Sequence, residues 1–166
     1  MASYNLITSP LSRSGFEPFG DVIEIENSRR FTINQGWAER FHDLAQIEVT
    51  AAGGRPLLSI FRARPRALPM RVLSVERHTL GSQAFVPLSR ARFLVVVAPA
   101  GTAPAPADFR AFVTDGLQGV NYRPGIWHHA LLALDQVSDF IVLDRGATEE
   151  DCEEIAFEAD EITLHL

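Results

Sequence analysis

The sequence predicts an all-β sandwich or barrel, and three observations support this fold class. About nine short runs rich in Val, Ile, Leu and Phe are separated by turn residues. No long apolar pattern has the 3.6-residue period of a helix. The chain has 166 residues, 46% of them hydrophobic, which suits one domain over residues 1–166. Many short strands joined by turns are typical of a β-sandwich or β-barrel.

The expected elements follow one another along the chain with few interruptions. A helical turn is plausible at residues 9–16, and residues 21–26 then alternate in polarity as a half-buried strand does. A second helical turn is plausible near residues 149–155. Residues 93–97 are apolar throughout, so both faces of that strand should be buried. The other expected strands are residues 57–62, 70–75, 83–88, 93–98, 109–114, 129–134, 140–144 and 161–166.

Three expected loops separate these strands. Residues 51–56 contain two adjacent glycines, residues 63–69 contain two prolines, and residues 98–108 form an Ala- and Pro-rich connection. Glycine and proline are the strongest local signals for turns and loops.

The charge composition excludes several classes of function. All 15 basic residues are Arg, against 21 acidic residues, giving a formal net charge of −6. An acidic domain lacks the electrostatic footprint of a nucleic-acid binder. Without Lys there is no Schiff-base chemistry and no P-loop lysine. Arg remains available for bidentate capture of a carboxylate.

The single cysteine, Cys152, excludes an internal disulfide and a site of several thiolates. Its acidic neighbours Asp151, Glu153 and Glu154 should raise its pKa and weaken it as a nucleophile. No run approaches the roughly 20 apolar residues that span a bilayer. Residues 1–10 lack a basic region followed by a long apolar one, so no signal peptide is expected there. A cytoplasmic location is the default expectation.

Two segments concentrate polar side chains that suit chemistry. In the first, Glu76 and His78 point to one face if they lie on a strand. Gly81-Ser82 signals a turn, so a hairpin is expected to bring Gln83 beside His78. A carboxylate on such a strand is otherwise usually solvated, and a lone His in a β protein is more often structural.

The second segment follows a Pro-Gly turn and contains Trp127, His128 and His129. On a strand the two adjacent histidines must face opposite ways, and His128 has the better position. Trp127 is more suited to a pocket wall than to chemistry.

The spacing Glu76-x-His78-x4-Gln83, followed by Gly125-x-x-His128, resembles the two cupin motifs. By this resemblance the four residues occupy the metal-ligand positions of a cupin-like β-barrel. Glu76 stands where cupins have His, and Gln83 stands where they have Glu. Glu76, His78 and His128 can still hold a divalent ion through one carboxylate and two imidazoles.

Residues 33–44 form a third polar segment, which includes Asn34, Arg40 and His42. The structural interpretation of this segment is a solvated loop and an edge strand. Its functional interpretation is a lid, or a dimer contact that completes the pocket. The pair His42-Asp43 has no accompanying Ser or Cys nucleophile motif, so a catalytic dyad is not expected.

Several stretches, in order over nearly the whole chain, carry a further resemblance: residues 16–23, 40–44, 76–85, 93–98, 110–122, 127–129 and 139–145. By these stretches the chain resembles the bacterial ureidoglycolate lyase family. The resemblance implies a cupin-like barrel, a homodimer, and cleavage of (S)-ureidoglycolate to glyoxylate and urea in allantoin degradation. It also implies a possible nickel-type divalent metal.

Such a cleavage needs a base for the hydroxyl and an acid for the departing nitrogen, work that suits His and Glu. His78 or His128 is expected to be the base, with Glu76 fixing the tautomer or acting as the acid. Gln83 is expected to hydrogen-bond the carboxylate or the urea carbonyl. Arg62, and after it Arg40, is the expected carboxylate partner; Asn34 and Trp127 complete the list of substrate-binding candidates.

Two alternative functions stay open. An amidohydrolase acting on the same substrate would release ammonia and would need a metal-activated water. A non-catalytic cupin would bind a small organic acid without turnover. Product analysis separates these alternatives from the lyase.

Overall fold

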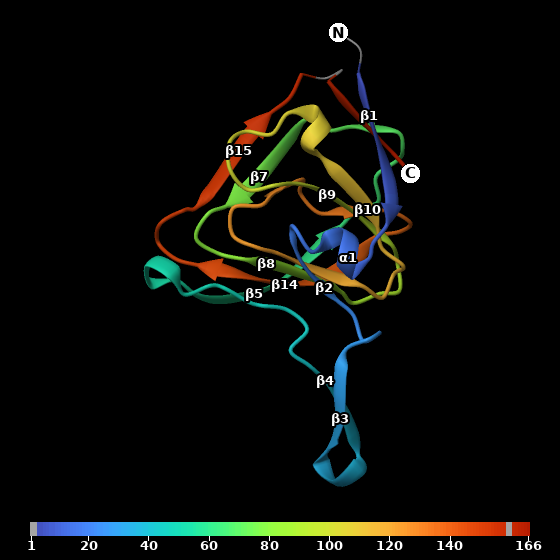
Figure 1. The fold of residues 1–166 in the computed structure, drawn as a ribbon, viewed down its shortest axis with the longest axis vertical. Helices are drawn as coiled ribbons and strands as arrows, with labels where there is room; N and C mark the ends of the chain where they lie inside the picture. The colour runs from blue at the N-terminus through green and yellow to red at the C-terminus, as the bar shows by residue number, and fades with distance from the viewer. Residues whose placement is uncertain (1–2, 159–160) are drawn as a thin grey trace.

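The computed structural model describes residues 3–158 and 161–166. Residues 1–2 lie outside the described residues. They belong to the segment 1–10, in which no signal peptide is expected. The described chain forms two large β-sheets and one projecting hairpin, with only short helices between them (Figure 1). The predicted all-β class is therefore confirmed, and the curled sheets agree with a cupin-like fold. Among the described residues no helix is long and apolar enough to cross a membrane.

The larger sheet has nine strands. Its order is β15-β7-β12-β9-β10-β1-β16-β6, and β13 also pairs with β9. The neighbours β7, β12 and β9 are antiparallel, whereas β1 runs parallel to both β10 and β16. The strands are β1 (Tyr4–Pro10), β6 (Met70–Arg71), β7 (Ser74–His78), β9 (Phe93–Ala98), β10 (Arg110–Val113), β12 (Trp127–His128), β13 (Leu132–Ala133), β15 (Cys152–Ala156) and β16 (Ile162–His165).

The smaller sheet has five strands in the order β2-β11-β8-β14-β5. Its longest pairing joins β5 and β14, which stay antiparallel and in register from Ala63 opposite Ser138 to Arg55 opposite Gly146. The strands are β2 (Gly20–Ile23), β5 (Arg55–Ala63), β8 (Gln83–Pro87), β11 (Gly119–Tyr122) and β14 (Ser138–Gly146).

The hairpin of β3 (Arg29–Ile33) and β4 (Ala38–His42) projects away from the rest of the molecule (Figure 1). We call it the arm. The 3-10 turn η1 (Asn34–Gly36) forms its tip. The other helical elements are α1 (Arg13–Phe16), η2 (Ala51–Gly53) and η3 (Pro106–Asp108). Ser12 caps α1 by accepting a hydrogen bond from the Gly15 amide at 3.2 Å.

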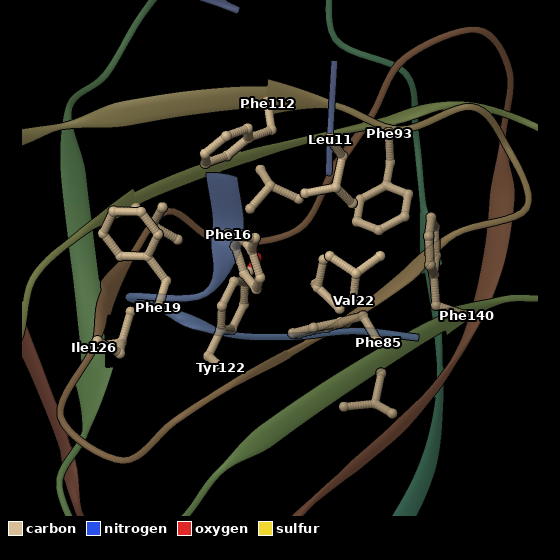
Figure 2. Close-up of a cluster of buried hydrophobic side chains, with 14 of the residues drawn as sticks. Leu11, Phe16, Phe19, Val22, Phe85, Phe93, Phe112, Tyr122, Ile126 and Phe140 are labelled. Carbon is tan, nitrogen blue, oxygen red and sulfur yellow. The ribbon is translucent and has the colours of Figure 1, made fainter. Parts of the chain in front are cut away.

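The main core lies between the two sheets and is rich in aromatic side chains (Figure 2). Phe93 from the larger sheet meets Phe140 from the smaller one, with ring centroids 5.1 Å apart in an edge-to-face arrangement. Val95 and Val97 face this core, whereas Leu94, Val96 and Ala98 join a second cluster on the other side of β9. The prediction that both faces of residues 93–97 are buried is confirmed.

Several predicted elements differ from the structure. The helical turn predicted near residues 149–155 is wrong, because residues 152–156 form the edge strand β15, held by its register with β7. Only the end of the helical turn at residues 9–16 is helical, since β1 extends to Pro10. The strand predicted at 129–134 is reduced to Leu132–Ala133, and the strand at 70–75 is divided between β6 and β7. Ladder pairing outweighed local propensity where β1 and β15 take the place of predicted helical turns.

The predicted hairpin from Glu76 to Gln83 is also wrong. β7 pairs with β12 and β15, whereas β8 pairs with β11 and β14. The turn at Gly81-Ser82 therefore carries the chain from one sheet to the other. As a result, His78 and Gln83 belong to opposite walls of the barrel rather than to neighbouring strands.

Candidate active site

Glu76, His78 and His128 converge on the neighbouring strands β7 and β12, close to the β15 edge of the larger sheet. Glu76 and His78 share a face of β7, and His128 on β12 is the direct register partner of Glu76. One ligand-type atom from each of the three side chains lies within 4.8 Å of the others. Strand parity places Glu76 and His78 on one face, and the pairing of β12 with β7 brings the second motif to the first.

His128 faces the space between the sheets and is only 1% exposed. Its ring stacks on Tyr122 from β11, with centroids 4.3 Å apart and planes 11° apart. Its Nδ1 lies 4.0 Å from Glu76 Oε1, while its Nε2 is buried without a hydrogen-bond partner in the described residues. Burial, and then the charge of His78, lowers the pKa of His128 to about 3. His128 is therefore neutral at physiological pH.

The low pKa of His128 makes stability depend on pH in a defined direction. In the unfolded chain a histidine titrates near 6.5, so between about pH 6.5 and 3 the unfolded state binds more protons than the native state. This contribution is complete above about pH 6.5 and is lost as the pH falls towards 3. We expect the free energy of unfolding in guanidinium, with chelator present, to fall between pH 8 and pH 5. The His128→Gln variant should show a smaller fall in the free energy of unfolding over this pH range. An equal fall would contradict the lowered pKa of His128.

His78 is partly buried and lies next to a second carboxylate. Its Nδ1 is 3.6 Å from Asp151 Oδ1, while its Nε2 is buried and has no hydrogen-bond partner in the described residues. Asp151 is itself positioned by the Leu80 amide, which donates to its Oδ2 at 3.1 Å. An acidic group beside Nδ1 favours the tautomer with its proton on Nδ1, which leaves the Nε2 lone pair free.

His78 also lines a cavity of about 430 Å³ that opens beside the cluster. A cavity of this size suits a small organic molecule. Its other walls come from the turn before β8, the end of β14 and the segment that leads into β15. The lining residues are Leu57, His78, Gly81, Ser82, Asp144, Arg145, Gly146, Ala147, Glu149, Glu150, Asp151 and Cys152.

Gln83 lies on β8 and is 6% exposed. Its Nε2 donates to Asp144 Oδ2 at 3.3 Å, which connects it to the wall of the cavity. Gln83 Oε1 and Asp144 Oδ1 are both buried without a partner among the described residues. Gln83 itself does not line the cavity and is connected to it only through Asp144, which was not among the site residues predicted from the sequence.

Arg145 is the only cationic side chain in the wall of this cavity within the described part of the chain. Its Nε donates to Ala51 O at 2.9 Å and its NH2 group to Ala52 O at 3.3 Å, so η2 holds it in place. Gly54 and Gly81 leave room for it, because a Cβ atom at either glycine would come within 2.6 Å of its side chain. The sequence contained one signal that could have identified Arg145. The charged pair Asp144-Arg145 comes directly after the apolar run 140–143.

Two other candidates lie away from the cavity. Arg62 is exposed on β5 and forms a bidentate ion pair with Asp139, each N–O distance being 2.8 Å. Trp127 points to the opposite face of β12 from His128 and packs in the second core cluster. Its Nε1 donates to Thr102 O, and the guanidinium of Arg77 lies 4.4 Å from its ring centroid. Neither side chain lines the cavity.

Arg40 and Asn34 lie on the arm, and both are exposed. Arg40 lies on β4 with its guanidinium 5.9 Å from the ring centroid of Phe31, and Asn34 forms part of η1 at the tip. Because the arm projects from the molecule, the chain does not bring these two residues to its own cavity (Figure 1). His129 turns away from the cluster and its Nδ1 lies 2.8 Å from Ala130 O.

Cys152 lies at the edge of the cluster, with its Sγ 3.8 Å from Glu76 Oε2. Burial, and then the charge of Glu76, raises the pKa of its thiol, so the predicted direction is confirmed. A thiol with a raised pKa is a poor nucleophile.

The three-residue cluster can accommodate a divalent ion. One ring nitrogen of each histidine and one Glu76 carboxylate oxygen all lie within 4.8 Å of one another. The Nε2 atoms of His78 and His128 are buried and have no hydrogen-bond partner among the described residues. Two imidazoles and a carboxylate form a usual ligand set for a divalent transition metal. The residues therefore fit such an ion on chemical grounds.

A curled β-barrel with a carboxylate and two imidazoles converging inside it defines a cupin-like protein with a small-molecule site. The family model for ureidoglycolate lyase matches residues 3–165. The chain belongs to the ureidoglycolate lyase family.

Curated relatives agree with this membership. A ureidoglycolate lyase from Burkholderia cepacia is 57% identical over 149 residues, which cover 89% of this chain and 84% of the relative. Those from Pseudomonas fluorescens SBW25 and Azotobacter vinelandii are 49% and 48% identical, with at least 93% of each chain covered. A dTDP sugar isomerase crystal structure from Desulfovibrio desulfuricans G20 has a TM-score of 0.46 at 14% identity over 86% of this chain and 87% of that chain, too distant to bear on function.

Proposed function

We propose that the protein cleaves ureidoglycolate to glyoxylate and urea. The observation that carries the proposal is the cavity of about 430 Å³ in which His78, Asp144 and Arg145 meet, in a chain of the ureidoglycolate lyase family. The reaction breaks the bond between the hydroxyl-bearing carbon and the urea nitrogen. It consumes no water and needs no nucleophile, so a site of proton-transferring and hydrogen-bonding groups suffices.

His78 is the residue best placed to move the proton. Its free Nε2 takes the hydroxyl proton as the carbonyl of glyoxylate forms and the C–N bond breaks. The resulting imidazolium returns that proton to the departing urea nitrogen, which balances the reaction. Asp151 and Glu76 stabilise the transient positive charge from either side. His128, with a pKa near 3, is a much weaker base.

Arg145 is the proposed partner of the substrate carboxylate. It is the cation that lines the cavity, and η2 fixes its guanidinium by hydrogen bonds to carbonyl oxygens rather than to a carboxylate. Its charge therefore stays available for an anion, and a guanidinium has five N–H donors to share. This proposal replaces Arg62 and Arg40 as the carboxylate site within one chain.

Glu76, His78 and His128 would be the residues that hold a divalent ion of the nickel type, if the protein carries one. Such an ion would supply positive charge that favours the ionised form of the substrate hydroxyl. The Nε2 lone pair of His78 cannot serve an ion and a proton at the same time. The two roles therefore predict opposite responses to a chelator.

The decisive experiment incubates the purified protein with fresh ureidoglycolate, with and without chelator, and quantifies urea, glyoxylate and ammonia. Equal amounts of urea and glyoxylate, unaffected by chelator, are expected from the acid–base role of His78. Urea that disappears with chelator would keep the lyase and make the three residues metal ligands. Ammonia without urea would identify an amidohydrolase, and no product would contradict catalysis altogether.

We also propose that the protein is a cytoplasmic homodimer that acts in allantoin degradation. Two observations support the dimer: Leu58 and Ile60 on β5 are 72% and 65% exposed, and Trp37 beside the arm tip is 89% exposed. Exposed apolar side chains of this size often mark an interface. Light scattering should give twice the chain mass, and a monomer would contradict the proposal.

The free thiol of Cys152 suits a reducing compartment.

A further inference from the structure

Two buried oxygen atoms, one on a residue that lines the cavity and one on that residue's hydrogen-bond partner, accept no hydrogen bond from the described residues. They are Gln83 Oε1 and Asp144 Oδ1. Leaving a buried acceptor unpaired costs free energy, so such atoms in a folded protein call for an explanation. The catalytic role of His78 and the charge of Arg145 do not use either atom.

The fold holds this pair of acceptors in a fixed arrangement. β8 and β14 are antiparallel neighbours with Ala84 opposite Leu143, and Gln83 and Asp144 are the next residues along their strands. Gln83 Nε2 donates to Asp144 Oδ2 at 3.3 Å. The reverse orientation of the amide would place its oxygen against a carboxylate oxygen, so the donor end must face Asp144. One oxygen of each side chain is thereby left free.

The ligand that fits two free acceptors is one that presents N–H donors. A ureido group does so, since it carries an N–H and an adjacent NH2 group in one plane. The carboxylate and aldehyde oxygens of glyoxylate only accept hydrogen bonds. Asp144 lines the same cavity as His78 and Arg145, so a substrate anchored at Arg145 and deprotonated by His78 can extend its ureido end towards Asp144.

We propose that Asp144 and Gln83 form the subsite that recognises the ureido group. This inference rests on the proposed function and adds to it the residues that select a urea-bearing substrate. Asp144 accepts from the N–H groups with a charged oxygen, which makes it the stronger of the two partners. Gln83 supplies the second acceptor and holds Asp144 in position.

The test measures binding of two unreactive probes by calorimetry. Ureidoacetate has the ureido group and the carboxylate but lacks the hydroxyl that must be deprotonated; acetate lacks the ureido group. The unmodified protein should bind ureidoacetate more tightly than acetate. Asp144→Asn should weaken ureidoacetate binding at least about tenfold, because the charged acceptor is lost. Acetate should bind no more weakly, since removing a negative charge cannot repel an anion.

Gln83→Met keeps the side-chain volume and removes only the amide, and it should weaken ureidoacetate binding several-fold. It also serves as the second variant if Asp144→Asn does not fold, as judged by thermal unfolding. Glu17→Gln makes the same charge change at an exposed position and should leave both affinities unchanged. For Asp144→Asn, the kinetic expectation is a higher KM for ureidoglycolate and a higher inhibition constant for urea.

The outcomes separate this subsite from the function on which it rests. If the unmodified protein turns over ureidoglycolate while both variants bind ureidoacetate normally, the subsite is wrong and the function stands. If ureidoacetate binding depends on Asp144 but no urea is ever produced, the subsite stands and the lyase activity is wrong. Equal weakening of ureidoacetate and acetate would overturn the subsite as well, because it would show a general loss of the cavity.

Discussion

His78→Ala is expected to lower kcat for ureidoglycolate cleavage by at least about a hundredfold, the low end of the effect of a lost general base. The physical reason is that His78, which lines the cavity, is the base in the proposed mechanism, whereas His128 has a pKa of about 3 and cannot replace it. Steady-state release of urea measures the effect. Either role of His78, as base or as metal ligand, predicts this loss.

The matched control is His165→Ala near the C-terminus. Its imidazole lies 3.1 Å from Asn5 Oδ1 on the neighbouring strand and does not line the cavity. This variant should keep normal turnover. Thermal unfolding of His78→Ala should resemble that of the unmodified protein, which separates a chemical loss from misfolding. Normal turnover in a folded His78→Ala variant would refute the assignment of this residue.

Phe140→Ala is expected to destabilise the fold by about 3–5 kcal/mol, the usual cost of emptying a buried phenylalanine site. Phe140 is fully buried on β14 and meets Phe93 edge to face across the two sheets (Figure 2). For a chain of this length each kcal/mol lowers Tm by about 2–4 °C. A fall in Tm of at least about 6 °C is therefore expected by calorimetry.

Phe61→Ala provides the comparison for this stability effect. Phe61 is the register partner of Phe140 on β5, yet it is partly exposed. The same truncation there removes less buried apolar area and should lower Tm by a smaller amount. An equal effect of the two substitutions would show that the core between the sheets does not depend on the Phe93–Phe140 contact.

The sequence located the residues of the Glu-His-His cluster within each segment because strand parity is a local property. Glu76 and His78 are two residues apart, so any strand that contains them places both on one face. The adjacent pair His128-His129 must likewise divide between two faces. The structure places His128 with Glu76 and His78 and turns His129 away. Strand parity selected the residues within each segment, and the resemblance to the two cupin motifs joined the segments into one site.

The rest of the site depends on pairings that are distant in the chain. Asp144 and Arg145 come to the cavity only because β14 pairs with β8 and β5 in the smaller sheet. Arg62 is a plausible carboxylate partner in the sequence, but its register opposite Asp139 gives it an exposed ion pair instead. The chain has 15 Arg residues, and the composition alone does not show which of them lines the cavity.

The sequence by itself therefore determined the all-β class, the strand buried on both faces and the Glu-His-His cluster. The class and the buried strand follow from residue periodicity and turn signals, which are local, whereas the cluster also needed the resemblance to the cupin motifs. Tertiary structure alone decided that β7 and β8 belong to different sheets, that residues 152–156 are a strand, and which Arg and Asp line the cavity. The physical reason is that hydrogen-bonded partners and cavity walls are set by contacts between segments far apart in the chain, where local propensity is too weak to choose among registers.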